Sequence, residues 1–227
     1  MKPFMIAITG GTGSGKSTLA NALADRLQPR GCAVITEDHY YLPRADHTPP
    51  VTGWSNEDVE RTINFDDPAT KDMAMFRGHL ADLRAGRAIQ QPVYDFGTHE
   101  RISGAIEEIA PAPFLIVEGV HVLADPGFAA LFDLTVYVDA AEDIRLIRRL
   151  RRDRNERGRD IERTIQQYLT FVRAAHLRFT EPAKFICDLV VADEGGTACR
   201  DDGPDAESIA KLCAPVWSLL QRRGVVD

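Results

Sequence analysis

Short apolar runs alternate with amphipathic stretches along most of the chain. Five of the runs predict buried strands of a parallel sheet, because a strand that is covered on both faces is apolar throughout. Between them, apolar residues recur every three or four positions, which predicts helices. The expected strands are 4–9, 33–36, 114–119, 134–139 and 188–192, and the expected helices are 16–28, 68–84, 141–156, 160–178 and 205–222. This order predicts an α/β fold with a five-stranded, mostly parallel sheet flanked by helices.

Two regions break the alternation. Residues 42–60 contain three prolines, a glycine and a tryptophan, which predicts an irregular loop. Residues 88–109 mix polar and apolar positions and predict a short antiparallel excursion, with Gly97 and Gly104 as turn candidates. Neither region is long enough to be a domain, so we expect one domain over residues 1–227. Both are expected to lie over the sheet edge where ligands of open α/β folds bind.

The composition indicates a globular protein. The 227 residues are 44% hydrophobic and 27% charged, which is enough for one sizeable core. No run approaches the roughly 18 apolar residues of a membrane span, and the apolar N-terminal run is too short for a signal peptide. We therefore expect a cytoplasmic protein without a membrane partner. The net charge of −7 argues against nucleic-acid binding but not against a small anion in a local basic pocket.

The four cysteines do not form a recognisable site. No CxxC pair occurs among Cys32, Cys187, Cys199 and Cys213. Neither a structural metal site nor a disulfide framework is expected from this spacing. Free thiols in a reducing compartment are the simpler interpretation.

The fragment GGTGSGKS at residues 10–17 fits the pattern G-x-x-x-x-G-K-[ST] and lies between an apolar strand and an amphipathic helix. Glycines let successive backbone N–H groups turn toward phosphate oxygens, and the helix N-terminus adds partial positive charge. A glycine-rich turn before an ordinary helix is the alternative. The predicted phosphate-binding residues are Gly10, Gly11, Thr12, Gly13, Ser14, Gly15, Lys16, Ser17 and Thr18.

Within this loop, Lys16 is expected to reach the β- and γ-phosphates, and Ser17 to bind Mg²⁺ through its hydroxyl. Thr18 is expected to cap or pack. The motif predicts a nucleoside triphosphate ligand without saying how it is used, since GTPases, motor ATPases and small-molecule kinases share it. A second site for a phosphate acceptor would distinguish among these classes.

Two carboxylates follow predicted strands. Asp38 lies in TEDHYY (36–41) and Glu118 in VEG (117–119). Carboxyl ends of parallel strands meet at one sheet edge, so both should face the γ-phosphate. One carboxylate can accept a proton from an attacking hydroxyl, and Ser17, Glu118 and Asp38 together can organise a metal and its water shell. The alternatives are a turn residue for Asp38 and a helix N-cap neighbour for Glu118.

Further motifs run along nearly the whole chain. They are GGTGSGKST (10–18), DHYY (38–41), NFDDP (64–68), PVYDFGTHER (92–101), VEG (117–119), LFDLTVYVDA (131–140), DIRLIRRLRRD (143–153), ERGRD (156–160) and QYLTFV (167–172). In these motifs the chain resembles the uridine (uridine–cytidine) kinases of the P-loop kinase superfamily. YDFxTHxR with ERGRD and QY is the combination that separates uridine kinases from phosphoribulokinases and pantothenate kinases.

The resemblance implies a catalytic base and a ribose site. Asp38 matches the family's base, which would take the proton of the ribose 5′-hydroxyl as that oxygen attacks the γ-phosphate. Asp66 and Arg152 match the residues that hold the ribose hydroxyls. A carboxylate suits a vicinal diol because it accepts two hydrogen bonds at once.

The resemblance also implies that the 88–109 excursion is a nucleoside-binding hairpin. Tyr94 and His99 match residues that hydrogen-bond the pyrimidine edge, and Phe96 matches an aromatic that packs on the base. Arg159 matches a second base contact, and Gln167 a polar residue of the pocket. Such a pocket would exclude a purine sterically. An ordinary hairpin with surface aromatics is the alternative.

Eight arginines lie between residues 145 and 159. Four of them are spaced to share one helix face: Arg145, Arg148, Arg149 and Arg152. A charge run is usually a solvated face. The resemblance implies instead a helical lid over residues 148–160, with Arg149 and Arg152 near the transferring phosphoryl group and Gly158 as a flexible point.

The chain departs from the family pattern in two places that bear on the acceptor site. Asp67 stands where the family has His, and beside Asp66 it would disturb the ribose site unless it pointed to solvent, as alternation along an extended segment allows. The 42–60 loop is unlike the family's and would reshape the acceptor mouth.

The resemblance therefore implies an enzyme that uses Mg²⁺ and ATP (or GTP) to convert uridine or cytidine to the 5′-monophosphate. Family members are often homotetramers, so a homo-oligomer is expected. A related P-loop kinase with another hydroxyl acceptor, phosphoribulokinase-like or pantothenate-kinase-like, is one alternative. A non-catalytic nucleotide-sensing protein is another, although the intact group of Lys16, Ser17, Asp38 and Glu118 favours the enzyme.

Overall fold

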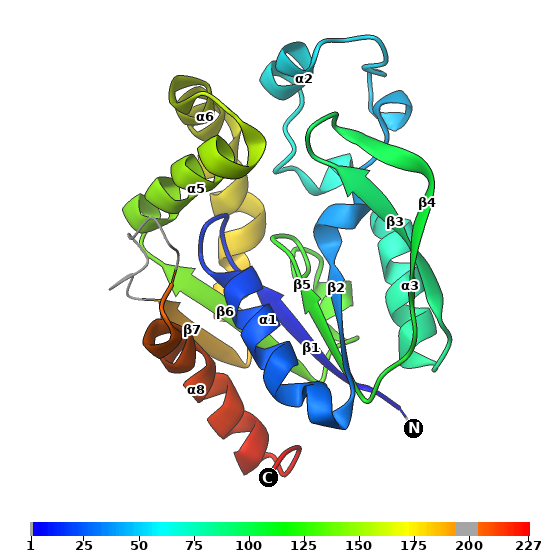
Figure 1. Cartoon of the computed structure of the whole chain (residues 1–227), viewed down its shortest axis with the longest axis vertical. Helices are drawn as coiled ribbons and strands as arrows, with labels where there is room; N and C mark the ends of the chain where they lie inside the picture. The colour runs from blue at the N-terminus through cyan, green and yellow to red at the C-terminus, as the bar shows by residue number, and fades with distance from the viewer. Residues whose placement is uncertain (1, 194–203) are drawn as a thin grey trace.

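A parallel sheet of five strands forms the centre of the computed structural model, which describes residues 2–193 and 204–227 (Figure 1). The strand order is β2-β5-β1-β6-β7, and every neighbouring pair is parallel. The prediction of a five-stranded parallel sheet flanked by helices is therefore confirmed. The strands are β1 (Phe4–Thr9), β2 (Cys32–Thr36), β5 (Phe114–Glu118), β6 (Leu134–Ala140) and β7 (Leu189–Asp193).

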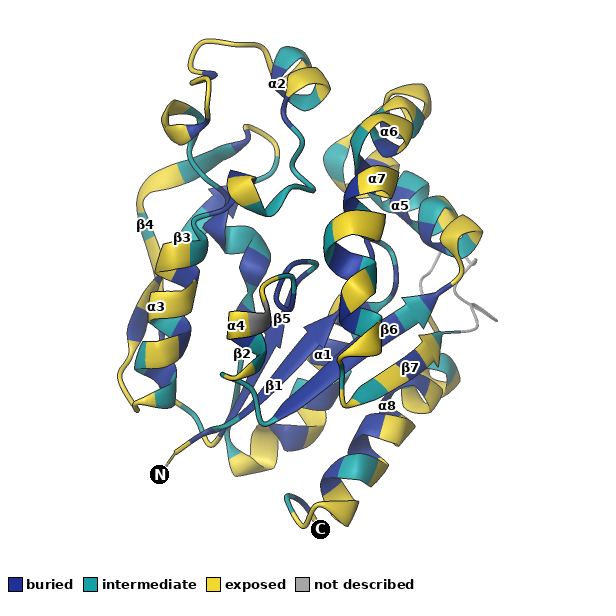
Figure 2. Cartoon of the chain, turned by 180° about the vertical axis from the view of Figure 1, so that it is seen from behind, coloured by how far each residue is buried: buried dark blue, intermediate teal, exposed yellow. Residues whose placement is uncertain are grey.

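Helices cover both faces of the sheet, so its central strands are buried throughout (Figure 2). On one face, α1 (Lys16–Leu27) and α8 (Ala206–Arg222) pack against strand residues such as Ile6 and Ile8. On the other face, α3 (Met73–Arg84) packs in the cluster that contains the alternate residue Met5. Successive side chains of a strand point to opposite faces, which explains why both sets must be apolar.

The remaining helices differ from expectation at their boundaries. α3 begins at Met73 rather than at residue 68, because Asp72 caps it and a separate 3₁₀ turn, Pro68–Thr70, precedes it. The long helix expected over 160–178 contains two π-helical stretches. The elements are α4 (Pro126–Ala129), α5 (Glu142–Arg157), α6 (Ile161–Gln167), a π turn (Tyr168–Val172), α7 (Arg173–Ala175), a π turn (His176–Thr180) and a 3₁₀ turn (Glu181–Phe185).

The prediction of an irregular loop over 42–60 is wrong for its C-terminal part. Helix α2 covers Asn56–Thr62, and a 3₁₀ turn covers Arg44–Asp46. The Ser55 side chain accepts a hydrogen bond from the Asp58 backbone N–H, which caps the helix. Val59 of α2 packs in a small separate apolar cluster with Val51.

The antiparallel excursion expected at 88–109 is present. Strands β3 (Ile89–Asp95) and β4 (Glu100–Ile109) form a separate two-stranded sheet that stands beside α3 (Figure 1). Gly97 lies in the turn at the tip, but Gly104 is not a turn residue, since it lies inside β4. The tip of this hairpin lies beyond the carboxyl ends of the parallel strands (Figure 1).

The described residues include no helix with the length and apolar character that a membrane crossing requires. Cys32, Cys187 and Cys213 are free thiols, and Cys199 lies outside the described residues.

Replacing Leu23 by Ala is expected to destabilise the fold by about 2–5 kcal/mol, because the side chain is fully buried between α1 and the sheet. Urea unfolding measures this loss. The control is Leu177→Ala, whose side chain is 56% exposed and whose loss should stay near 0.5 kcal/mol, as is typical of surface positions. Equal losses in the two variants would contradict the packing described here.

Candidate active site

The glycine-rich loop connects β1 to α1 and requires its glycines. Gly13 and Gly15 have φ angles of 74° and 94°, a region that side chains other than glycine rarely adopt. A Cβ on Gly10 would meet the Val138 carbonyl oxygen, and one on Gly13 would meet the Arg145 carbonyl oxygen. The loop is therefore closely packed against β6 and α5.

The loop presents a buried hydroxyl without a protein partner and a buried ammonium group. Among the described residues, none hydrogen-bonds the buried Ser14 hydroxyl. Lys16 is buried, with its Nζ 3.9 Å from the nearest Glu118 carboxylate oxygen, and Thr18 is half-buried on α1. An orphaned hydroxyl and a buried ammonium group at a helix N-terminus fit an anionic ligand.

Glu118 ends β5 and reaches this loop, as the sheet-edge argument predicts. The Ser17 hydroxyl donates to its Oε2 at 3.1 Å. Burial raises the pKa of Glu118, although the charge of Lys16 and the hydrogen bond from Ser17 oppose that effect. Within the described part of the chain there is no group of three or more His, Cys, Asp or Glu residues that could hold a metal.

Asp38 lies in the 3₁₀ turn Glu37–Tyr40, directly after β2. Its Oδ1 is 2.9 Å from Nζ of Lys71, which also binds Glu37 at 2.8 Å. Burial acts to raise the pKa of Asp38, but the charges of Lys71 and Lys16 hold it well below its usual range. Asp38 is therefore a fixed, ionised carboxylate.

Lys71 also contacts Glu37, whose side chain is fully buried beneath the cavity-facing Asp38. Glu37 accepts a hydrogen bond from the His121 backbone N–H at 2.8 Å, and its side chain fills the space that a Cβ on Gly119 would need. Burial opposes ionisation, but Lys71 and His121 lower the pKa of Glu37 to about 2. The sequence analysis assigned no role to Lys71, Glu37 or His121, because no motif in it indicates one for these residues.

One cavity brings the two predicted halves of the site together. Lys16 from the phosphate loop, Asp38 from the β2 turn and the aromatic hairpin all line it. Tyr41, Phe65, Val120 and Arg157 line it as well and were not predicted. The predicted residues among its lining are Thr12, Lys16, Asp38, Asp66, Tyr94, Phe96, His99, Arg149, Arg152, Arg159 and Gln167.

Aromatic rings form one wall of this cavity. The His99 ring stacks on Phe65 at a centroid distance of 4.9 Å, and Tyr94 lies 5.1 Å from Tyr41 and 5.3 Å from Phe96. In the described structure nothing hydrogen-bonds the buried Tyr94 hydroxyl. Flat apolar faces beside an unpaired hydroxyl suit a planar ligand with polar edges.

The arginines of α5 divide into two groups. Arg149 and Arg152 line the cavity, and the Arg149 Nη2 donates to Gln167 at 2.8 Å. Arg145 and Arg148 do not line it, but the expected shared face is present, because all four side chains lie against the glycine-rich loop. Arg148 Nη1 donates to the Gly13 carbonyl, Arg149 and Arg152 lie 3.3 and 3.5 Å from the Thr12 hydroxyl, and a Cβ on Gly11 would meet Arg145 Nη1. Arg145 donates to the Ala140 carbonyl and Arg148 pairs with Asp193, so both support the phosphate loop from behind.

The carboxylate of Asp153 lies among four arginines of α5 and the segment that follows it. Its side chain is fully buried and lies 2.9 Å from Arg152 Nη2, 3.4 Å from Arg157 Nη1 and 3.5 Å from Arg149 Nε and Arg159 Nη1. The motif RRD contains this residue, but sequence spacing did not reveal its role.

Asp67 does not disturb the neighbouring Asp66. Its Oδ1 accepts a hydrogen bond from the Ala69 backbone N–H at 2.9 Å, which caps the 3₁₀ turn. The Asp67 side chain is therefore occupied by capping, and Asp66 alone of this pair lines the cavity.

A glycine-rich phosphate loop lies between the first strand and the first helix. It faces a carboxylate and a cavity with an aromatic wall. This arrangement is typical of the P-loop kinase class of folds. The phosphoribulokinase from Rhodobacter spheroides shares this fold with a TM-score of 0.59 at 15% identity, over 84% of this chain and 70% of that one. At this identity the similarity shows the fold alone.

Sequence comparison gives the family. Residues 5–197 match the model of the Phosphoribulokinase / Uridine kinase family. A uridine kinase of Alkaliphilus metalliredigens is 40% identical over 98% of this chain and 99% of its own length, and one of Clostridium perfringens is 41% identical over 86% and 89%. The chain belongs to the Phosphoribulokinase / Uridine kinase family.

Replacing Lys71 by Met is expected to destabilise the fold by about 3–5 kcal/mol near neutral pH, because it leaves Glu37 and Asp38 without their cation. Denaturant unfolding measures the loss. The exposed Lys211 is the control, and Lys211→Met should cost about 1 kcal/mol or less.

The loss should depend on pH with a definite sign. In the wild type the pKa of Glu37 is lowered from 4.5 to about 2, so its contribution is present above about pH 4.5 and is lost as the pH falls. In the variant the buried carboxylates favour the protonated form, so stability falls as the pH rises. A loss that is the same at about pH 5 and about pH 8 would contradict this explanation.

Proposed function

We propose that this chain transfers the γ-phosphoryl group of ATP (or GTP) to the 5′-hydroxyl of uridine or cytidine, giving the nucleoside 5′-monophosphate and the nucleoside diphosphate. The observation that carries the proposal is the single cavity in which Lys16, Asp38 and the aromatic wall meet. The names of the two relatives, which cover most of this chain, support the choice of acceptor.

The donor end uses the phosphate loop. Backbone N–H groups of residues 10–15 and the Ser14 hydroxyl bind phosphate oxygens, and Lys16 neutralises the β- and γ-phosphates. Ser17 and Glu118 would hold Mg²⁺, since a hydroxyl and a carboxylate are the hard oxygen ligands that this ion takes, and its charge would neutralise the phosphates further. Arg149 and Arg152 stabilise charge on the transferring group.

Asp38 acts on the acceptor hydroxyl. As the 5′-oxygen forms its bond to the γ-phosphorus and the bond to the β-phosphate oxygen breaks, the hydroxyl proton passes to the Asp38 carboxylate. A carboxylate with a lowered pKa is a weak base. It suffices here because phosphoryl transfer has a loose transition state, in which positioning contributes more than early proton removal. Lys71 keeps this carboxylate ionised and immobile.

The acceptor end recognises a nucleoside. Tyr94 offers its unpaired hydroxyl to the base edge together with His99 and Arg159, and Phe96 packs on the base face. Asp66 and Arg152 bind the ribose hydroxyls, and Gln167 holds Arg149. Aromatic rings can stack on a planar base but not on an aliphatic acceptor. The wall therefore favours a nucleoside over the acceptors of phosphoribulokinase-like or pantothenate-kinase-like enzymes.

The proposed working unit is one domain over residues 1–227, in which the 88–109 hairpin forms the acceptor wall and residues 148–160 form a lid. Gly158, with a φ of 62°, ends α5 and gives the lid a turning point. Closure excludes water that would otherwise hydrolyse ATP. We also propose a cytoplasmic location, which is consistent with the free thiols of Cys32, Cys187 and Cys213.

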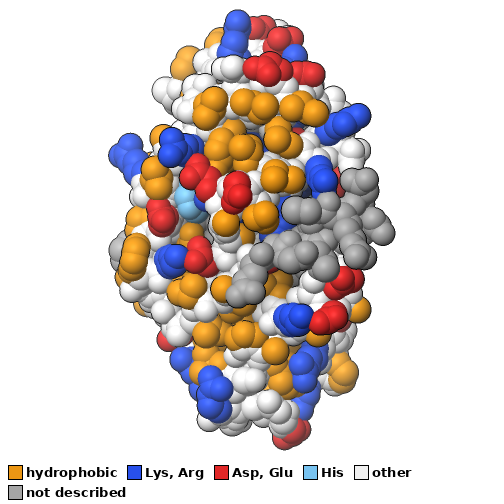
Figure 3. Space-filling view, turned by 90° about the vertical axis from the view of Figure 1, so that its left-hand side faces the viewer, with side chains coloured by type: hydrophobic (Ala, Val, Ile, Leu, Met, Phe, Trp, Pro, Cys, Tyr) orange, Lys and Arg blue, Asp and Glu red, His pale blue; other side chains and the backbone are white. Residues whose placement is uncertain are grey.

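A homo-oligomer is also proposed. Figure 3 shows apolar side chains gathered on the side of the molecule to which α5 and β7 belong. In these elements, Ile147 and Val190 are 38% and 40% exposed, although both are large and apolar. Among the described strands, β7 is also an edge strand of the sheet, a position at which another strand can pair. The molecular mass in solution measures the assembly.

The proposal is tested by measuring phosphoryl transfer from ATP and GTP to a panel of nucleosides and phosphorylated sugars. Uridine or cytidine should be the best acceptor, with a purine nucleoside excluded. Turnover of a sugar in preference would favour the phosphoribulokinase-like alternative. ATP binding without turnover of any acceptor would favour a nucleotide sensor.

Asp38→Asn is expected to keep nucleoside binding and to lower kcat by about 10²–10⁴-fold, because the amide cannot take the hydroxyl proton. Steady-state kinetics and a binding titration with uridine measure both effects. Asp67→Asn is the matched control, since Asp67 caps a turn and does not line the cavity. A kcat near that of the wild type in Asp38→Asn would remove this residue from the mechanism.

His99→Ala is expected to raise the KM for uridine more than the KM for ATP, because His99 lies on the aromatic wall and not on the phosphate loop. Varying each substrate at saturation of the other separates the two constants. Equal increases in both would refute a role in base recognition.

A further inference from the structure

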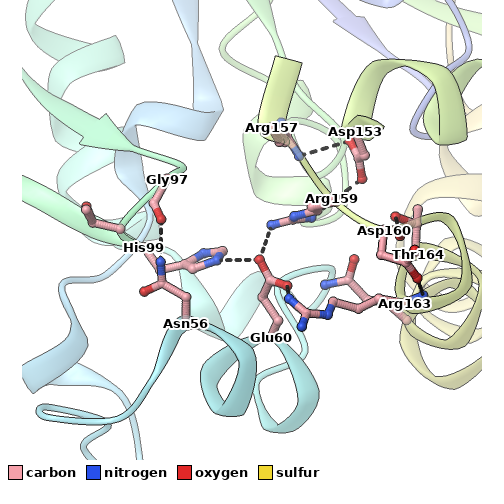
Figure 4. A network of polar contacts seen from close by, with 12 residues as sticks. Asn56, Glu60, Gly97, His99, Asp153, Arg157, Arg159, Asp160, Arg163 and Thr164 are labelled. Atoms are coloured by element: carbon pink, nitrogen blue, oxygen red, sulfur yellow. Dashed lines mark hydrogen bonds and ion pairs between the residues drawn. The ribbon is translucent and has the colours of Figure 1, made fainter. Parts of the chain in front are cut away.

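Glu60 of α2 joins three segments that are distant in the sequence (Figure 4). Its Oε1 lies 2.9 Å from Nε2 of His99 at the hairpin tip and 2.9 Å from Nη2 of Arg159 between α5 and α6. Its Oε2 lies 3.7 Å from Nη1 of Arg163 on α6. The side chains of Glu60, His99 and Arg159 are 11%, 4% and 9% exposed, so their contacts are shielded from water, whereas Arg163 is more exposed.

The contact with Glu60 determines which ring nitrogen of His99 carries the hydrogen. Burial acts to raise the pKa of Glu60, but the hydrogen bond with His99 and the charges of Arg159 and Arg163 lower it, so the carboxylate is ionised. An ionised carboxylate only accepts hydrogen bonds, so Nε2 of His99 must carry the hydrogen. Only Nδ1 of the ring then remains for a bound nucleoside.

His99 also needs support from its surroundings. It is a residue other than glycine with a positive φ, 54°, in the left-handed region. The tip on which it lies is held to α2 by a second contact, in which Nδ2 of Asn56 donates to the Gly97 carbonyl at 2.6 Å. The side chain of His99 is fixed between the Phe65 ring and Glu60.

Arg159, the other partner of Glu60 Oε1, is also held from two directions. Its backbone N–H donates to the Asp153 carbonyl at 2.9 Å, and its guanidinium group lies between Asp153 and Glu60. Both His99 and Arg159 line the acceptor cavity, whereas Glu60 does not. Glu60 therefore acts on a ligand in that cavity only through these two residues.

On the basis of the proposed function, we propose that Glu60 is a positioning residue for the acceptor nucleoside. It orients His99 for the base, and it ties to α2 both the end of the lid, through Arg159, and the start of α6, through Arg163. Recognition of the pyrimidine and closure of the lid therefore share one carboxylate.

The test compares Glu60→Gln with Glu57→Gln. Glu57 lies on the same helix and pairs with Arg163 at 3.0 Å, but its side chain is 68% exposed. Glu60→Gln should raise the KM for uridine about tenfold and leave the KM for ATP within about twofold, because it removes charge-assisted hydrogen bonds at the acceptor end alone. Glu57→Gln should change neither constant by more than about twofold.

Two further measurements separate positioning from a general effect on folding. In a His99→Ala background, Glu60→Gln should have a smaller effect on the uridine KM, because the part that acts through the His99 ring is already lost. Backbone hydrogen exchange over residues 158–167 should be faster in Glu60→Gln than in the wild type or Glu57→Gln. This exchange requires no substrate.

The outcomes are distinguishable. A wild-type protein that phosphorylates no pyrimidine nucleoside overturns the proposed function, and hydrogen exchange then still decides whether Glu60 holds the lid segment. If the wild type is active but Glu60→Gln matches Glu57→Gln in uridine KM and in exchange, the role of Glu60 is overturned. Parallel increases in the KM for uridine and for ATP would also overturn it.

Discussion

The buried ammonium group of Lys71 holds the carboxylate on which both halves of the site depend. Its Nζ lies between Glu37 and Asp38, and Glu37 in turn binds the chain after β5 through the His121 backbone. A carboxylate in this position is excluded from solvent on one side and faces the cavity on the other. Without the cation, neighbouring carboxylates would repel one another or become protonated. The chemistry proposed for Asp38 therefore rests on an ion pair behind the cavity.

Electrostatics also shape the opposite side of the cavity. Four arginines, Arg149, Arg152, Arg157 and Arg159, surround the single buried carboxylate of Asp153, so positive charge remains in excess there. Burial and the charge of Arg152 lower the pKa of Arg157, which reflects this crowding. We expect an anionic donor to relieve such repulsion, so that bound phosphates would stabilise the α5–α6 segment. The proposed closure of the lid would then be linked to nucleotide binding by the same excess charge.

Local patterns in the sequence were sufficient to predict the sheet, the glycine-rich loop and the antiparallel hairpin, whereas the roles expected for the hairpin side chains came from the family resemblance. Each depends on neighbours within a few positions, such as the glycines of residues 10–15 or the leucines of α1. The residues that hold the site together were missed because their partners are distant in the chain. Lys71 is 33 positions from Asp38, and Glu60 is 39 positions from His99. Which arginines of α5 reach the cavity likewise depends on Asp193 and Asp153, which helical spacing alone does not reveal.

The central claim is that donor and acceptor ends meet at Asp38 in one continuous cavity. The most direct measurement is inhibition by a single compound in which the 5′-oxygens of adenosine and uridine are joined through a chain of four phosphates. The account predicts that this compound competes with ATP and with uridine, and that it binds more tightly than either substrate. Competition with ATP alone, with the uridine KM unchanged, would contradict it.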